Sequence, residues 1–207
     1  MKTTFLVLTF LLYVITFAAA DLNPVFDIAD SKLVTGVDYF IVPISGGEGG
    51  GVTLASVRNK TCQLDVAQDS LYRNGLWVRI HPVNIKKGIS GRVIRQSTDL
   101  IISISSTKTK TCGKSTIWKV DNYDKLRKRY FVTIGGVEGY GQGQSGWFRI
   151  LKENNYYKII YCSQVQCKSA PCDVMCKNVG PYSEHGRTLF ALTDKPYVVY
   201  FEKVIKS

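Results

Sequence analysis

Six cysteines are the residues of this chain whose type and spacing indicate the clearest chemistry. Two lie far apart and four lie close together near the C-terminus: Cys62 and Cys112, then Cys162, Cys167, Cys172 and Cys176. An even number of cysteines in an exported protein indicates disulfide bonds, and the sequence alone leaves the pairing open. The alternative is a metal site built from the C-terminal four, which an oxidising compartment disfavours.

Catalytic patterns are missing from the rest of the chain. The only histidines are His81, which precedes Pro82 in a predicted loop, and His185. Neither lies in a Gly-x-Ser-x-Gly or His-Glu-x-x-His context, and six paired thiols leave no cysteine nucleophile. We therefore expect no catalytic residues, no enzymatic activity, no metal and no cofactor.

A Gly-x-Gly-x-x-G string occurs at Gly141, Gly143 and Gly146. A dinucleotide site needs a helix N-terminus after the glycines, whereas residues 147–150 open another strand. We interpret these glycines as loop residues.

The N-terminus has the three parts of an export signal: Lys2, an apolar run at 5–17 and small residues at 18–20. The run is short for a membrane helix, which needs roughly 20 residues. The expected organisation is a signal peptide at 1–20 and one domain at 21–207, secreted to the apoplast or delivered to the vacuole, without membrane contact after cleavage. Asn59 begins the glycosylation sequon.

The formal net charge of +11 favours acidic partners or anionic surfaces and does not indicate nucleic acid in particular. The densest basic run, residues 125–129, is expected to be a solvated loop.

Runs of β-branched and aromatic residues separated by turn signals predict strands. They lie at 39–42, 76–80, 100–104, 130–134, 157–161 and 197–201. No long window after the signal has a helical apolar period. The predicted class is all-β, with a closed or nearly closed sheet.

Several segments, taken in order, resemble the plant Kunitz-type trypsin inhibitor family, especially its miraculin-like branch. The segments are 25–27, Leu33, 35–36, Tyr39, Ile41, Pro43, 97–100, 115–121, 130–139, 147–150, Leu189 and 191–196, the last of which is similar to the closing strand of the family. Departures are Ala29-Asp30-Ser31, where the family usually has a glycine, and a longer C-terminal cysteine cluster.

This resemblance implies a β-trefoil of twelve strands with pseudo-threefold symmetry. It also implies three disulfides, Cys62–Cys112, Cys162–Cys176 and Cys167–Cys172. No cysteine occurs at 152–161, where some relatives form an interchain bridge, so a monomer is expected.

By the same resemblance, an exposed protease-binding loop follows the strand at 76–80. Its residues are Pro82, Val83, Asn84, Ile85, Lys86 and Lys87. Counting from Pro82 puts Asn84 at the specificity position, and a slip of two residues puts Lys86 there instead. Asn84 predicts weak trypsin inhibition, because an amide does not neutralise the carboxylate of a trypsin pocket. Thr35 takes the place of an asparagine that braces the loop in trypsin-active relatives.

The predicted function is inhibition of an endopeptidase, with a serine protease as the first candidate target. The predicted setting is plant defence or the response to stress. Two alternatives stay open: inhibition of a cysteine protease, and a non-inhibitory ligand-binding or storage role. A lectin is disfavoured because no glutamine stands two residues before Trp77, Trp118 or Trp147.

Overall fold

The computed structural model of the chain describes residues 22–44, 50–58, 61–62, 64–70, 74–84, 89–105, 111–138, 146–162 and 176–205. These residues form twelve β-strands and no α-helix. The strands are β1 (Asp38–Pro43), β2 (Val52–Ala55), β3 (Asp65–Gln68), β4 (Val78–Pro82), β5 (Leu100–Ile104), β6 (Trp118–Val120), β7 (Val132–Ile134), β8 (Phe148–Glu153), β9 (Tyr156–Cys162), β10 (Cys176–Glu184), β11 (Arg187–Thr193) and β12 (Val198–Lys203). The predicted all-β class is confirmed. Within these ranges, no helix of a length and hydropathy suited to crossing a membrane was found.

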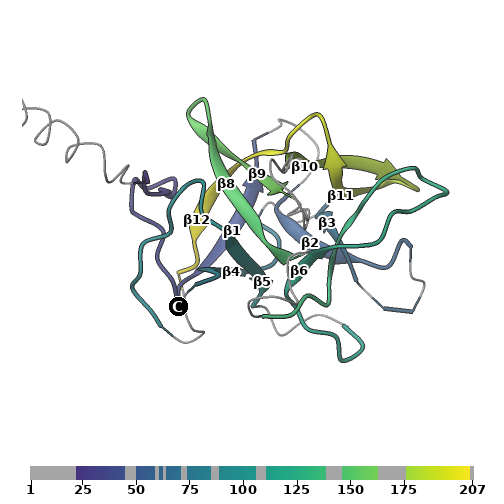
Figure 1. Cartoon of the computed structure of the whole chain (residues 1–207), viewed down its shortest axis with the longest axis horizontal. Helices are drawn as coiled ribbons and strands as arrows, with labels where there is room; N and C mark the ends of the chain where they lie inside the picture. The colour runs from purple at the N-terminus through teal and green to yellow at the C-terminus, as the bar shows by residue number, and fades with distance from the viewer. Residues whose placement is uncertain are drawn as a thin grey trace, which may run out of the picture.

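Six strands form a closed barrel, which occupies one half of the molecule in Figure 1. Around the ring their order is β12, β1, β4, β5, β8 and β9, and the pairing of β12 with β9 closes it. Long ladders join β12 to β1, β4 to β5 and β8 to β9, and short ladders join the other neighbours. Closure pairs both edges of every barrel strand and leaves no exposed sheet edge there.

The other six strands form three hairpins, β2–β3, β6–β7 and β10–β11. The hairpins meet one another because β3 pairs with both β7 and β11. Each set of four consecutive strands therefore supplies two barrel strands with one hairpin between them. This threefold repetition is the predicted β-trefoil.

The core joins the units through buried side chains. Trp118 is fully buried and makes edge-to-face contacts with Phe148 and Phe190, each with ring centroids 5.9 Å apart. Such a geometry places the positive edge of one ring against the negative face of another. A second cluster contains Ala67, Phe131 and Leu189, one residue from each unit.

The apolar runs identified in the sequence all coincide with strands. Five match the barrel strands β1, β4, β5, β9 and β12, and the run at 130–134 overlaps β7. One interpretation is corrected. Leu189 and residues 191–196 lie in β11 and the turn after it, whereas the barrel is closed by β12.

Two disulfides lie within the described part of the chain. Cys62 is bonded to Cys112, and Cys162 to Cys176. In the second pair the two residues face each other in the β9–β10 ladder, with Cα atoms 4.0 Å apart. These are two of the three pairings that the family resemblance implied, and they rule out a metal site made of all four C-terminal cysteines. Cys167, Cys172 and Asn59 lie outside the described residues, as does the signal segment 1–20.

The basic run at 125–129 is only partly a solvated loop. Lys125, Leu126 and Lys128 are exposed. Arg127, in contrast, donates through Nε to Glu184 Oε2 (2.6 Å) and through Nη1 to Asp124 Oδ2 (3.0 Å). This guanidinium therefore fastens the loop between β6 and β7 to the β10–β11 hairpin.

We predict a pH-dependent loss of stability for Arg127→Ala. The side-chain hydrogen bond from Arg127 lowers the pKa of Glu184 from its ordinary value of 4.5. A carboxyl whose pKa is lower in the folded state stabilises the fold above its unfolded pKa, and this contribution is lost as the pH falls through the folded pKa. Urea unfolding at pH 7 should show a loss of about 1 kcal/mol, and the loss should shrink toward pH 3.

Lys125→Ala is the matched control, since Lys125 is an exposed cation in the same loop. It should leave the unfolding free energy nearly unchanged at both pH values. An equal loss for Arg127→Ala at pH 7 and pH 3 would contradict the assignment.

Candidate functional site

The first arm of the predicted loop is a continuation of β4. Pro82 is paired with Leu100, and the Val83 amide donates to the Asp99 carbonyl (3.0 Å), which extends the β4–β5 ladder by one residue. The Val83 side chain packs against a small buried cluster of Ile101, Ile117 and Trp147. Asn84 is exposed. Ile85, Lys86 and Lys87 lie outside the described residues, so the choice between Asn84 and Lys86 stays a prediction.

The segment that leaves the predicted loop, residues 89–95, is called the returning arm. It is hydrogen-bonded to Thr35, which is buried (1% exposed). The Gly91 amide donates to the Thr35 carbonyl (2.9 Å), and the Thr35 amide donates to the Arg92 carbonyl (2.8 Å). The Thr35 hydroxyl also accepts a hydrogen bond from the Arg92 amide (3.1 Å). Among the described residues, Thr35 thus contacts the arm that leaves the loop, through both its backbone and its side chain.

Gly36 lets this arm come close. Its φ of +83° is rarely adopted by residues with a side chain, and a Cβ built at Gly36 would lie 2.7 Å from the Cβ of Ser90. A glycine is needed here for both reasons.

The N-terminal segment, residues 22–36, connects the returning arm to the barrel. The Phe26 amide donates to the Tyr157 hydroxyl and the Val34 amide to the Tyr39 hydroxyl, each at 2.9 Å. Burial raises the pKa of Tyr39. The N-terminal segment also forms β-bridges to the returning arm, from Pro24 to Arg95 and from Val34 to Val93. The arm is therefore held to the barrel through an intervening layer of backbone hydrogen bonds.

A turn in this N-terminal segment accounts for a departure from the family pattern. Asp27 is buried, and its Oδ1 accepts hydrogen bonds from the amides of Ala29 (3.0 Å) and Ser31 (2.9 Å). Asp30 adopts a φ of +56° in the middle of the turn. Aspartate tolerates this left-handed conformation better than most residues, so the turn forms without the usual glycine.

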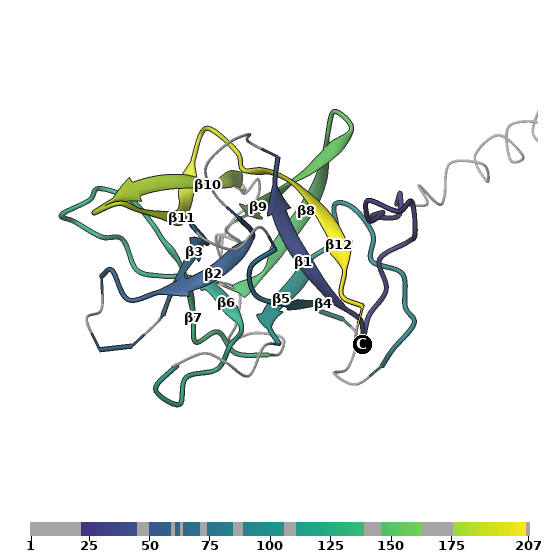
Figure 2. The same cartoon turned by 180° about the vertical axis from the view of Figure 1, so that it is seen from behind.

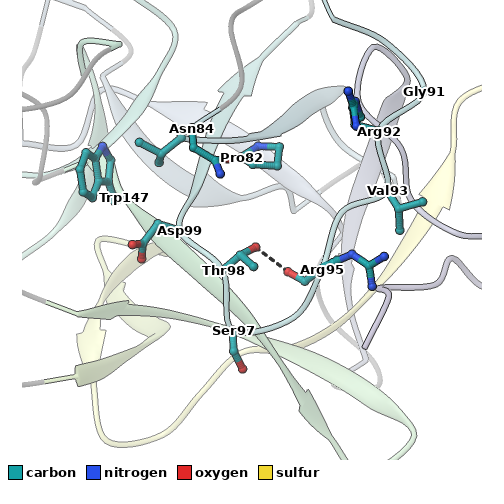
Figure 3. A pocket seen from close by; sticks show the side chains of 11 residues that line it. Pro82, Asn84, Gly91, Arg92, Val93, Arg95, Ser97, Thr98, Asp99 and Trp147 are labelled. Carbon is teal, nitrogen blue, oxygen red and sulfur yellow. Dashed lines mark hydrogen bonds between the residues drawn. The ribbon is translucent and has the colours of Figure 1, made fainter. Parts of the chain in front are cut away.

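A pocket of about 620 Å³ lies between the two arms (Figure 3). Figure 3 shows Trp147 on one side of it, Arg92 and Arg95 on the opposite side, and Pro82 and Asn84 between them. Arg95 and Thr98 form part of one wall of the pocket. The Thr98 hydroxyl donates a hydrogen bond to the Arg95 carbonyl (2.8 Å), which stabilises that wall. The exposed Asn84 thus stands beside a concave surface.

An acidic residue, Asp99, also lines this pocket, and its carboxylate is held by an arginine. The Asp99 carboxylate accepts a hydrogen bond from Arg149 Nε (2.7 Å), while the Asp99 carbonyl holds Val83. Asp99, Trp147 and Gly36 thus lie against the two arms of the predicted loop, and none of them was predicted from the sequence to do so. No local pattern marks them, since each acts on residues distant in sequence.

The histidines do not form a catalytic pair. His81 lies on β4, with Nε2 3.9 Å from Glu138 Oε1, and His185 lies in the turn between β10 and β11 beside Glu184. In the part of the chain that the structure describes, no group of three or more histidine, cysteine, aspartate or glutamate residues has a metal-binding arrangement.

Comparison with known proteins gives consistent matches over nearly the whole chain. A legume Kunitz family, described as "Trypsin and protease inhibitor", matches residues 25–203. Kunitz trypsin inhibitor 5 of Arabidopsis thaliana is 36% identical, covering 89% of this chain and 87% of its own. Miraculin of Synsepalum dulcificum is 38% identical, covering 88% and 84%.

Solved structures agree with these matches. The Kunitz-type cysteine protease inhibitor PCPI-3 from potato has a TM-score of 0.71 and 30% identity, covering 90% of this chain and 100% of that one. Soybean trypsin inhibitor has a TM-score of 0.67 and 25% identity, covering 88% and 100%.

We predict that Gly36→Ala destabilises the returning arm more than Gly91→Ala does. Both glycines have positive φ, but a Cβ at Gly91 meets nothing within 4 Å. Gly91→Ala therefore reports backbone strain alone, about 1 kcal/mol, and Gly36→Ala adds the clash with Ser90. Urea unfolding should show the larger loss for Gly36→Ala, and amide exchange at Arg92 should become faster. Equal losses in the two variants would show that the close approach contributes nothing.

Proposed function

This chain belongs to the legume Kunitz family of trypsin and protease inhibitors, and on that basis we propose that it inhibits a serine endopeptidase by presenting residues 82–87 as a substrate-like loop. Family members are protease inhibitors rather than enzymes. Protease inhibition is thus the general function that the relatives support, and a target endopeptidase is the partner that it requires.

The observation that carries the proposal is the support on both sides of Asn84. Before Asn84, Val83 is hydrogen-bonded to Asp99 and packs against an apolar cluster. After Asn84, Arg92 is hydrogen-bonded to Thr35. A loop whose two arms are already fixed loses little conformational entropy when it enters a protease cleft, so more of the contact energy appears as affinity. The Cys62–Cys112 disulfide closes the part of the chain that contains this loop and restricts its conformational freedom.

Asn84 is the proposed specificity residue. It is exposed immediately after the last residue held in the β4–β5 ladder. An amide suits a polar, uncharged specificity pocket better than the buried carboxylate of a trypsin pocket. We therefore propose a serine protease of a specificity other than that of trypsin, with Lys86 as the specificity residue in the competing register.

We also propose that the chain is secreted. The signal pattern at 1–20 and the two disulfides support an oxidising destination, the apoplast or the vacuole. There the chain would act as a monomer against proteases of attacking organisms or in stress.

A cysteine protease is the second candidate target. It is supported by the likeness to the potato cysteine protease inhibitor, which has one of the higher TM-scores among the structural relatives. A non-inhibitory role is the third candidate, because the relatives also include miraculin and the 21 kDa seed protein of Theobroma cacao.

We predict that Asn84→Arg strengthens trypsin inhibition by at least about thirtyfold. An arginine at the specificity position pairs with a carboxylate that is otherwise desolvated and unpaired, an effect of about 2 kcal/mol or more. Inhibition constants would be measured for the wild-type chain and the variant against trypsin, chymotrypsin, an elastase and a papain-type protease.

Lys86→Ala is the matched variant for the register. With Asn84 in the specificity pocket it should change inhibition only slightly. Trypsin inhibition that is lost in Lys86→Ala and kept in Asn84→Ala would overturn the register. A wild-type chain that inhibits only the papain-type protease would favour the second candidate, and one that inhibits none of the four would favour the third.

A further inference from the structure

A second concave site lies at the hairpin end of the molecule. A cleft of about 800 Å³ opens between the 121–130 segment and strands β9, β10 and β11. We call it the tyrosine cleft, after Tyr123, Tyr130 and Tyr161, which line it together with Leu192 and Lys177. Its volume falls within the range of small-molecule sites, roughly 300–1,000 Å³.

The tyrosine cleft is remote from the protease-binding loop. Figures 1 and 2 show β10 and β11 at one end of the long axis, whereas the N-terminal segment that braces the loop lies at the other. A ligand in this cleft and a protease on the loop would therefore not compete for the same surface.

Two of the three aromatic side chains of the cleft are not used by the core. Tyr123 and Tyr130 are 47% and 44% exposed, and their ring centroids are 5.1 Å apart at an interplanar angle of 60°. Neither ring belongs to a buried cluster. Tyr161 is only partly buried and packs against the main core from the cleft. Three phenol rings around one hollow provide flat apolar surfaces and hydroxyl groups for a flat aromatic ligand.

The charges in the cleft favour an anion. Lys177 is the cross-strand neighbour of Tyr161, and its Nζ lies 2.8 Å from Asp194 Oδ1. The Asp194 side chain is 90% exposed, so this ion pair contributes little and a ligand carboxylate can replace it. The exposed Lys128 adds a second cation to the lining, whereas the guanidinium of Arg129 lies over the Tyr182 ring, 4.4 Å from its centroid.

Both acidic residues of the lining are already paired with cations. Asp121 already accepts a hydrogen bond from Arg58 (3.2 Å). Asp194 is the exposed partner of Lys177 described above. The cleft thus combines aromatic surface with positive charge.

We propose that the tyrosine cleft binds a small aromatic acid, with its ring against Tyr123 and Tyr130 and its carboxylate on Lys177. This site is independent of protease inhibition and adds a ligand-binding function to the opposite end of the fold. The ligand class is a single aromatic ring with one acidic group, as in a phenolic acid.

The test is isothermal titration of the chain with 4-hydroxycinnamate, 4-hydroxycinnamyl alcohol and acetate. The aromatic acid should bind saturably with one site per chain. The alcohol, which keeps the ring and lacks the charge, should bind at least about fivefold more weakly, and acetate should not bind detectably at millimolar concentration. Absence of saturable binding of 4-hydroxycinnamate would overturn the proposal.

Variants locate the binding. Tyr130→Ala should weaken binding of 4-hydroxycinnamate at least about tenfold, and Lys177→Met should remove most of the difference between acid and alcohol. Tyr156→Ala and Lys203→Met are matched controls: Tyr156 is a similarly exposed tyrosine at the other end of β9, and Lys203 is an exposed lysine at the end of β12.

Circular dichroism and thermal unfolding check that each variant is folded. Both controls should bind like the wild-type chain. Folded Tyr130→Ala and Lys177→Met variants that also bind like the wild-type chain would place the ligand elsewhere and overturn the proposal. Inhibition by the chain of its protease should be unchanged in all four variants.

Discussion

Closure of the barrel by β12 is the constraint on which the rest of the structure depends. This strand is the last in the chain, and it pairs with β1 on one side and β9 on the other. The amide of Ile28, in the N-terminal segment, also donates to the carbonyl of Phe201 on β12 (2.9 Å). The first and last described segments of the chain are therefore joined to each other along β12.

The returning arm of the proposed protease-binding loop is held to that closed barrel through a series of contacts. Tyr39 on β1 and Tyr157 on β9 accept hydrogen bonds from the N-terminal segment, and Thr35 in that segment holds the returning arm at Arg92. The first arm needs no such intermediate, because it is a direct extension of β4. Two different mechanisms thus fix the two sides of one exposed residue, Asn84.

The two ends of the fold can carry separate functions because they are built from different parts of each unit. Strands β4 and β5 and the N-terminal segment hold the arms of the proposed loop, whereas the β10–β11 hairpin, the 121–130 segment and the end of β9 form the tyrosine cleft. The cation of Arg127 shows how firmly the latter parts are joined, since it ties that segment to the β10–β11 hairpin. A rigid scaffold with chemically distinct loops at its ends is a common basis for added functions.

Five of the six barrel strands were predicted from the sequence alone, because each is a run of apolar residues that faces the core. The sixth, β8, begins within residues 147–150, which were expected to open a strand. Of the hairpin strands, only β7 was identified from an apolar run: β2, β3 and β6 have three or four residues each, β10 contains mainly polar residues with a glycine and a proline, and β11 was taken for the closing strand. Local pattern also did not predict which cysteines pair or what Thr35 contacts. Cys162 and Cys176 meet because β9 and β10 align them, and Thr35 meets Arg92, 57 residues away, because the N-terminal segment folds back along the returning arm. A run of apolar residues predicts which stretch of chain is buried, whereas the partners of each residue across the fold are set only when the ring of strands closes.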